Sequence, residues 1–232
     1  MLEFASEVSH KVHIEGIDIA SRLFPRTYPP NITFSIHSVT SLPLSWHSTF
    51  AYVHQRLLMA ALTTSMWKSA ISEMFRVLRP GGWVELLENG TPPSVGPYSA
   101  KLEAMARALW YHKGLMYDHE HKLPSILSET GFTKIHVDRR VISLRQVDRN
   151  RAMADVMYGM KTPMLKAGGF GLVSSAEEYD DVVARASQEW RENDGVITMY
   201  PHSFTMRILV LEIHTLSLIQ SYTMNLLHHL LR

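Results

Sequence analysis

Residues 75–88 read FRVLRPGGWVELLE. Pro80 cannot continue a helix, because it lacks an amide hydrogen and its ring clashes with the preceding turn. Gly81 and Gly82 can take the positive φ values of a sharp reversal, and the WVELL that follows is apolar enough for a buried strand. Upstream, apolar side chains recur at the three- and four-residue spacings of one helical face: Trp67, Ala70, Ile71, Met74, Phe75 and Leu78. Helix, tight turn and buried strand make half of an α/β repeat.

The remaining sequence continues this alternation. Strands are predicted at residues 12–20, 31–39, 50–54, 83–87 and 132–144. Helices are predicted at residues 1–10, 55–62, 65–79, 98–112, 123–130, 148–166 and 176–192. Since no hairpin signal separates the first strands, we expect a mainly parallel sheet.

Composition limits the function classes. With 232 residues, 46% of them hydrophobic and 19% charged, the chain can bury the core of one domain. Its net charge of +1 gives no electrostatic case for binding nucleic acid or a membrane surface. The absence of cysteine excludes disulfides, cysteine zinc sites and cysteine nucleophiles, and fits an intracellular protein, cytoplasmic or nuclear. We see neither a secretory signal nor an apolar run of the ~20 residues that would span a bilayer.

Several segments occur together in an order that resembles one family. They are residues 16–19 (GIDI), 29–31 (PPN), Leu42-Pro43 with Trp46, residues 50–58, Trp67 with Glu73, and residues 76–88. Together they resemble the class I S-adenosylmethionine-dependent methyltransferases, and among these the fungal LaeA-like group related to the velvet-complex regulator of secondary metabolism. The resemblance covers roughly residues 1–190. It implies a Rossmann-like, doubly wound α/β fold with a mainly parallel sheet and an antiparallel last strand.

The resemblance also implies where S-adenosylmethionine would bind. Asp18, with Ile19 beside it, ends the first predicted strand, where a carboxylate can accept hydrogen bonds from both ribose hydroxyls. A strand-end aspartate that caps the next turn is the alternative. His37 and Ser38 follow the second strand and would border the adenine.

The third predicted strand carries the expected reaction site. His54 and Gln55 would face the methionine moiety and the methyl acceptor. Since the sulfonium is already activated, the protein mainly has to hold donor and nucleophile in line. His54 is the candidate general base, and a histidine that satisfies a strand-end backbone group is the alternative.

The sequence departs from the family at its beginning. It has no glycine-rich loop of the kind that receives the cofactor after the first strand. Residues 1–5 resemble the helix that follows this loop, so we expect an N-terminally truncated domain that lacks the first strand. A missing central strand would leave its two neighbours with unpaired backbone groups. We therefore expect either marginal stability or another strand in the gap beside residues 12–20.

The domain limits follow from the extent of this resemblance. A methyltransferase-like domain is expected at residues 1–202, with a helical insertion at about 145–192, and a divergent apolar segment at 203–232. Within this segment, residues 208–231 are predicted to form a packing or dimerisation helix, a candidate interface for homo- or hetero-oligomers. An aberrant terminus from a gene-model error is the alternative.

Two functions remain open. The first is methyl transfer from S-adenosylmethionine to a small-molecule or protein acceptor in fungal secondary metabolism, with an acceptor pocket built from residues 89–122 and 151–192. The second is a catalytically inactive methyltransferase-like fragment or interaction protein. No metal site is expected, because the histidines of His119-Glu120-His121 diverge on a helix. Residues 168–171 (GGFG) are predicted to form a hinge or lid, because they do not follow a strand.

Overall fold

The computed structural model describes residues 12–206 and 217–221, with side chains up to Ile197. The strands are β1 (His13–Asp18), β2 (Ile32–Ile36), β3 (Phe50–Arg56), β4 (Leu78–Asn89), β5 (Phe132–Val137), β6 (Arg140–Ser143), β7 (Val196–Met206) and β8 (Ser217–Ser221). The helices are α2 (Thr64–Val77), α3 (Pro97–His112), α4 (His119–Thr130), α5 (Val147–Gly159), α6 (Lys161–Lys166) and α7 (Ala176–Glu192). Short 3₁₀ turns are η1 (Ser21–Leu23), η2 (Leu44–Trp46) and η3 (Gly168–Gly171).

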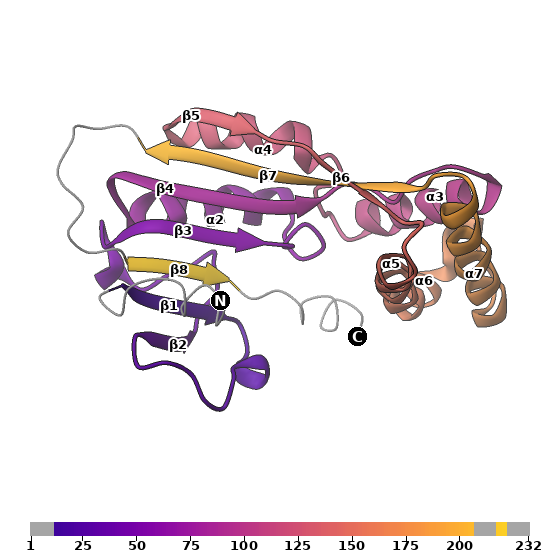
Figure 1. Ribbon diagram of the computed structural model, residues 1–232, viewed down its shortest axis with the longest axis horizontal. Helices are drawn as coiled ribbons and strands as arrows, with labels where there is room; N and C mark the ends of the chain where they lie inside the picture. The colour runs from indigo at the N-terminus through magenta and orange to yellow at the C-terminus, as the bar shows by residue number, and fades with distance from the viewer. Residues whose placement is uncertain (1–11, 207–216, 222–232) are drawn as a thin grey trace.

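The strands form one sheet in the order β2-β1-β8-β3-β4-β7-β5, with β6 paired to β7 (Figure 1). The pairs β1–β2, β1–β8, β3–β4 and β3–β8 are parallel. β7 is antiparallel to β4, β5 and β6. The α/β fold with a parallel half and an antiparallel late strand is therefore confirmed.

β8 lies between β1 and β3, where the sequence predicted a gap. Leu218 is in register with Ile14 on one side and with Tyr52 on the other. The sequence led us to expect either marginal stability or another strand in this gap, and the structure has another strand there. The helix predicted at residues 208–231 is wrong for Ser217–Ser221, which form β8. The rest of that range lies outside the described residues. The domain boundary expected at residue 202 falls inside β7.

The helices form two groups. α2 and α4 pack on one face, where a core cluster joins them to β3 and β4. Figure 1 shows α3, α5, α6 and α7 gathered beyond the carboxyl ends of β3 and β4. These helices share a second core, so the helical insertion expected at about 145–192 packs together with α3.

The stretch from Phe75 to Glu88 joins α2 to β4 as predicted, but with a bulge in place of a free turn. α2 ends at Val77 and β4 begins at once. Phe50 pairs with Leu78 and Tyr52 with Trp83, so four residues of β4 loop out between successive pairs. Gly81 has a φ of 79°, which explains why a glycine stands there.

Other local predictions had mixed outcomes. The helices predicted at 98–112, 123–130 and 176–192 are confirmed within a few residues. The helix predicted at 55–62 is wrong, because β3 continues to Arg56 and Leu57 then takes a positive φ of 59°. The strand predicted at 132–144 is divided into β5 and β6, and the helix at 148–166 into α5 and α6. The helix predicted at 1–10 lies outside the described residues.

Within residues 12–206 and 217–221, none of the helices has both the length and the apolar character needed to cross a membrane.

Candidate functional site

The end of β1 lies beside the end of β2, as the family resemblance implied. Asp18 is only 5% exposed, and its Oδ1 accepts a hydrogen bond from the Ala20 amide at 3.0 Å. The backbone carbonyl of Asp18 accepts from the His37 amide at 3.0 Å. Asp18 therefore caps the turn that follows β1, which was the alternative to ribose binding, and Oδ1 is the oxygen that does so.

The segment after β2 is held by short-range contacts. The His37 ring meets Trp46 edge-on, with 5.2 Å between ring centroids. The Ser38 hydroxyl lies 2.7 Å from that of Thr40 and accepts from the Thr40 amide at 3.2 Å. Ile19 is 47% exposed at the same edge of the sheet. The residues predicted to border the ribose and adenine thus share one edge.

His54 belongs to a three-residue polar cluster on the sheet face opposite α2. Tyr52 donates to Glu85 Oε2 at 2.5 Å, and His54 Nδ1 lies 2.9 Å from the same oxygen. The hydrogen bond from His54 holds the pKa of Glu85 below its usual range although burial opposes it. Burial raises the pKa of Tyr52, and the contact with Glu85 adds to this effect. Gly16 on β1 and His54 on β3 pair with the same residue of β8, so their side-chain positions lie on the same face of the sheet. Asp18, two residues after Gly16, points to that face as well, because side chains alternate along a strand.

Gln55 points to the other face, away from His54. Its side chain is completely buried, and Nε2 donates to Glu88 Oε1 at 2.6 Å. Glu88 also accepts from the amides of Leu58 at 2.9 Å and Met59 at 3.1 Å. Burial raises the pKa of Glu88 to about 7, although these three hydrogen bonds oppose the shift. The carboxylate therefore ties the loop after β3 to the end of β4.

Sequence reasoning missed Glu88, and it also missed the direction of Gln55. The available signal was an acid at the end of the apolar strand predicted at residues 83–87. Gln55 was predicted to bind the cofactor, but its amide is engaged inside the protein, so any effect on a ligand passes through Glu88 and the loop.

A cavity of about 530 Å³ opens beyond the carboxyl ends of β3 and β4. Its wall combines the loops after these strands with α3, α5 and the start of β7. The lining residues are Leu57, Met59, Ala60, Asn89, Gly90, Thr91, Pro92, Ala106, Trp110, Tyr117, Ala152, Met153, Asp155, Val156, Met157, Gly159, Met160 and Ile197. Both parts of the predicted acceptor region, 89–122 and 151–192, contribute to the lining, but residues 161–192 do not, and His54 is not among the lining residues.

Polar side chains are a minority of the cavity lining. The Tyr117 hydroxyl donates to Glu103 on α3. His119 is fully buried next to the backbone of Asn89 and Tyr117, and burial lowers its pKa, so the ring is neutral at pH 7. His121 points outward, as the diverging geometry predicted. Among the described residues, no group of three or more metal-ligating side chains is placed to hold an ion.

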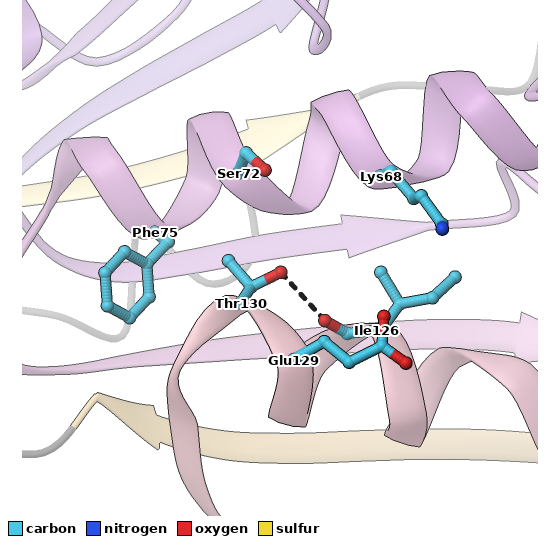
Figure 2. A pocket seen from close by; sticks show the side chains of 6 residues that line it. All are labelled: Lys68, Ser72, Phe75, Ile126, Glu129 and Thr130. Atoms are coloured by element: carbon cyan, nitrogen blue, oxygen red, sulfur yellow. Dashed lines mark hydrogen bonds between the residues drawn. The ribbon is translucent and has the colours of Figure 1, made fainter.

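A second hollow, of about 420 Å³, lies between α2 and α4 (Figure 2). It is lined by Lys68, Ser72, Phe75, Ile126, Glu129 and Thr130. The Thr130 hydroxyl is used within its own helix, donating to the Ile126 carbonyl at 2.8 Å. This hollow lies on the helix-covered face and shares no residue with the cavity at the strand ends, so we do not count it as part of the site.

Comparisons with known proteins agree with this architecture. No family model matches the chain. N-methyltransferase sirN of Leptosphaeria maculans is 41% identical over 76 residues, which are 32% of this chain and 27% of that protein. N-methyltransferase tcpN of Claviceps purpurea is 26% identical over 210 residues, covering 83% of this chain and 73% of the relative.

A solved structure shares the fold. Phosphoethanolamine N-methyltransferase 2 of Haemonchus contortus, in complex with phosphomonomethylethanolamine and S-adenosylhomocysteine, superposes with a TM-score of 0.54 at 15% identity. The match covers 89% of this chain and 46% of that chain, so this chain spans less than half of that enzyme. The chain therefore has the α/β fold of the class I S-adenosylmethionine-dependent methyltransferases and is related in sequence to fungal N-methyltransferases.

Proposed function

We propose that this chain is an S-adenosylmethionine-dependent methyltransferase of fungal secondary metabolism that methylates a nitrogen atom of a small apolar molecule. The observation that carries the proposal is the apolar cavity at the carboxyl ends of β3 and β4, on the edge of the sheet that also holds Asp18 and His37. In open α/β sheets, ligands bind at this edge. The names of the relatives support nitrogen as the atom that is methylated.

The cofactor would occupy the edge formed by the ends of β1, β2 and β3. Asp18, buried at a strand end, would accept hydrogen bonds from the ribose, and Ile19 would cover it. His37 and Ser38 would border the adenine. His54 would face the methionine moiety, and Gln55 would act indirectly, by holding Glu88 against the loop at Leu58 and Met59. When bound, S-adenosylmethionine supplies an activated methyl group, and the protein aligns it with the acceptor.

His54 is the proposed general base. With Nδ1–H directed at Glu85, the neutral imidazole keeps Nε2 as the nitrogen that can take a proton. A base is needed only for an acceptor nitrogen that still carries its proton at the pH of the reaction. Since His54 precedes the cavity-lining residues Leu57 and Met59 on the same segment, this role requires the acceptor to extend from the cavity toward β3.

Within the family, we infer a LaeA-like enzyme with a methyltransferase-like domain at residues 1–202, to which β8 adds a strand. The ordered segments between Gly16 and Glu88 support this inference. A small-molecule acceptor is favoured over a protein acceptor because the cavity is a concave space bounded by α3, α5 and the loops after β3 and β4. We place the protein inside the cell, in the cytoplasm or nucleus, on the ground that it has no cysteine.

The test is a calorimetric titration of the 232-residue chain with S-adenosylmethionine and with S-adenosylhomocysteine. We expect micromolar binding that is lost in Asp18→Ala and kept in the exposed control Asp138→Ala. Absence of binding to a chain with native circular dichroism would refute the proposal. It would favour the second candidate, a methyltransferase-like protein without catalytic activity that acts through interactions.

A further inference from the structure

Asp155 is the one charged residue in the lining of the cavity beyond the ends of β3 and β4, all of which lies in the described part of the chain. It is on α5, one helical turn from Ala152 on one side and from Gly159 on the other, and both of these residues also line the cavity. Asp155 is exposed, and its side chain is short. Its carboxylate therefore lies at the mouth of the cavity, where both water and a ligand can reach it.

The carboxylate of Asp155 has no partner within the described residues. It takes part in no ion pair and no side-chain hydrogen bond there. Arg151 is four residues away, the spacing at which helical ion pairs form, but the two side chains do not pair, and Arg151 does not line the cavity. On α7, by contrast, Asp181 accepts from Arg185 at the same spacing and at 2.9 Å. Asp155 is thus available to a cation that enters the cavity.

Other charges around the cavity do not compete with Asp155. Its lining, as far as the structure describes the chain, contains no lysine, arginine or histidine. Arg107 lies over the ring of the lining residue Tyr117, but it is paired with Glu103, so its charge is compensated. The whole chain has a net charge of +1 and does not attract cations at long range. A preference for a cation in this cavity would therefore be local to Asp155.

The rest of the wall defines the body of the ligand. Met59, Met153, Met157 and Met160 line the same cavity. Thioether sulfurs adapt in shape and make favourable contacts with aromatic rings. A carboxylate at the mouth repels anions and attracts cations. The ligand that fits best has an apolar aromatic body and one positively charged group.

We propose that Asp155 is a specificity-determining residue, which binds the ammonium group of an aromatic amine whose ring lies among these methionines. This inference rests on the proposed function only in identifying the bound amine with the methyl acceptor. Since a protonated nitrogen has no lone pair to attack a methyl group, the ammonium at Asp155 serves recognition and is not the nitrogen that is methylated.

The test compares two matched probes on the full ¹⁵N-labelled chain, without cofactor. The probes are 2-(aminomethyl)naphthalene, a cation at pH 7, and 2-naphthalenemethanol, which is neutral. Titrations give both dissociation constants, and shifts of the Gly159 and Met160 amide signals locate the probe in the cavity. At low ionic strength we expect the ammonium to bind about fivefold more tightly than the alcohol, the upper range for an ion pair at a protein surface. The preference should shrink at about 1 M salt, where the Debye length is about 3 Å.

The variants separate the local charge from the charge of the whole chain. Asp155→Asn keeps the shape but removes the charge, so the two probes should bind it within about twofold of each other. The control Asp148→Asn changes the net charge equally, at an exposed position on α5 that does not line the cavity, and should keep the preference for the ammonium.

Three outcomes would each overturn the proposal. They are equal affinities in the unmodified chain at low ionic strength, a preference that persists in Asp155→Asn, and no binding of either probe. If the preference is found but S-adenosylmethionine does not bind, the role of Asp155 stands and methyl transfer is refuted. If S-adenosylmethionine binds but the preference is absent, the proposed function stands and the role of Asp155 is refuted.

Discussion

Gln55 Nε2 donates a 2.6 Å hydrogen bond to Glu88 Oε1, and both side chains are completely buried. The same carboxyl group accepts from the amides of Leu58 and Met59. The ends of β3 and β4 are thereby joined next to Met59, which lines the cavity. The wall of the candidate acceptor site thus depends on one buried acid.

Changing Glu88 to glutamine should remove a pH dependence of folding. Burial raises the pKa of Glu88 from 4.5 to about 7. Between these two values the unfolded chain releases a proton that the folded chain retains, so the contribution of Glu88 to stability is full below pH 4.5 and falls as the pH rises to 7. A shift of this size corresponds to about 3 kcal/mol. Urea unfolding at pH 4.5 and pH 7 should show this loss for the unmodified chain and a smaller one for Glu88→Gln.

The control for this change is Glu192→Gln, at the exposed end of α7. It should leave the pH dependence of the unmodified chain unaltered. If Glu88→Gln and the unmodified chain lose the same free energy of unfolding between the two pH values, Glu88 is ionised in the folded protein and the interpretation fails.

The sequence predicted those parts of the fold that local patterns determine. The apolar spacing from Trp67 to Met74 located α2, and Pro80 with Gly81 located the change from helix to strand. Asp18 was placed at the ligand-binding edge because it ends a predicted strand, whereas His37 was placed beside it by the family resemblance. Apart from the position of His37, these inferences need only neighbouring residues or a general rule of topology.

The remaining features depend on pairing between distant segments. The direction of Gln55 follows from the register of β3 against β4, and a shift of one residue would have turned its side chain to the opposite face of the sheet. No pattern in Ser217–Ser221 indicates that it lies between β1 and β3, since a five-residue segment with only two apolar residues is ambiguous between helix and strand. Trp110 was assigned to a helix, but its place in a cavity wall depends on how α3 packs with α5.

Replacing Glu189 by alanine should destabilise the helix that carries Trp110. Glu189, on α7, accepts from the backbone amides of Tyr98 at 3.0 Å and Ser99 at 2.7 Å, in the first turn of α3. These amides have no partner within their own helix. By analogy with the loss of a helix cap, we expect a cost of about 1 kcal/mol in urea unfolding at pH 7. The exposed Glu192→Ala should cost less than about 0.5 kcal/mol.

The effect of Glu189→Ala should also depend on pH. Burial alone would raise the pKa of Glu189, but the amides of Ser99 and Tyr98 outweigh it and lower the pKa. Its contribution is therefore present above the ordinary value of 4.5 and is lost as the pH falls through the lowered value. A cost that is independent of pH down to pH 2 would contradict a carboxylate cap.

Gly82→Ala tests the junction between α2 and β4. A Cβ atom at this position would lie 2.9 Å from the Arg79 carbonyl oxygen and 3.1 Å from that of Ala51. Both are backbone atoms, which cannot rotate away, so we expect a loss of about 2 kcal/mol in thermal or urea unfolding. Gly168→Ala is the comparison, because a Cβ there meets nothing within 4 Å and only the positive φ of 80° opposes it. A smaller loss for Gly82→Ala than for Gly168→Ala would show that the bulge has another shape.

Ile219→Pro tests the position of β8. Ile219 is in register with Glu15 on β1 and with Val53 on β3, so it lies at the centre of the sheet. Proline removes a backbone donor and is tolerated in sheets essentially only at edges and bulges. In this position we expect a loss of about 3 kcal/mol in urea unfolding, together with faster hydrogen exchange at the amides of β1 and β3. Ile219→Val, which keeps the backbone and a β-branched side chain, should cost less than about 1.5 kcal/mol. If proline and valine had equal effects and exchange in β1 were unchanged, β8 would not lie between these strands in solution.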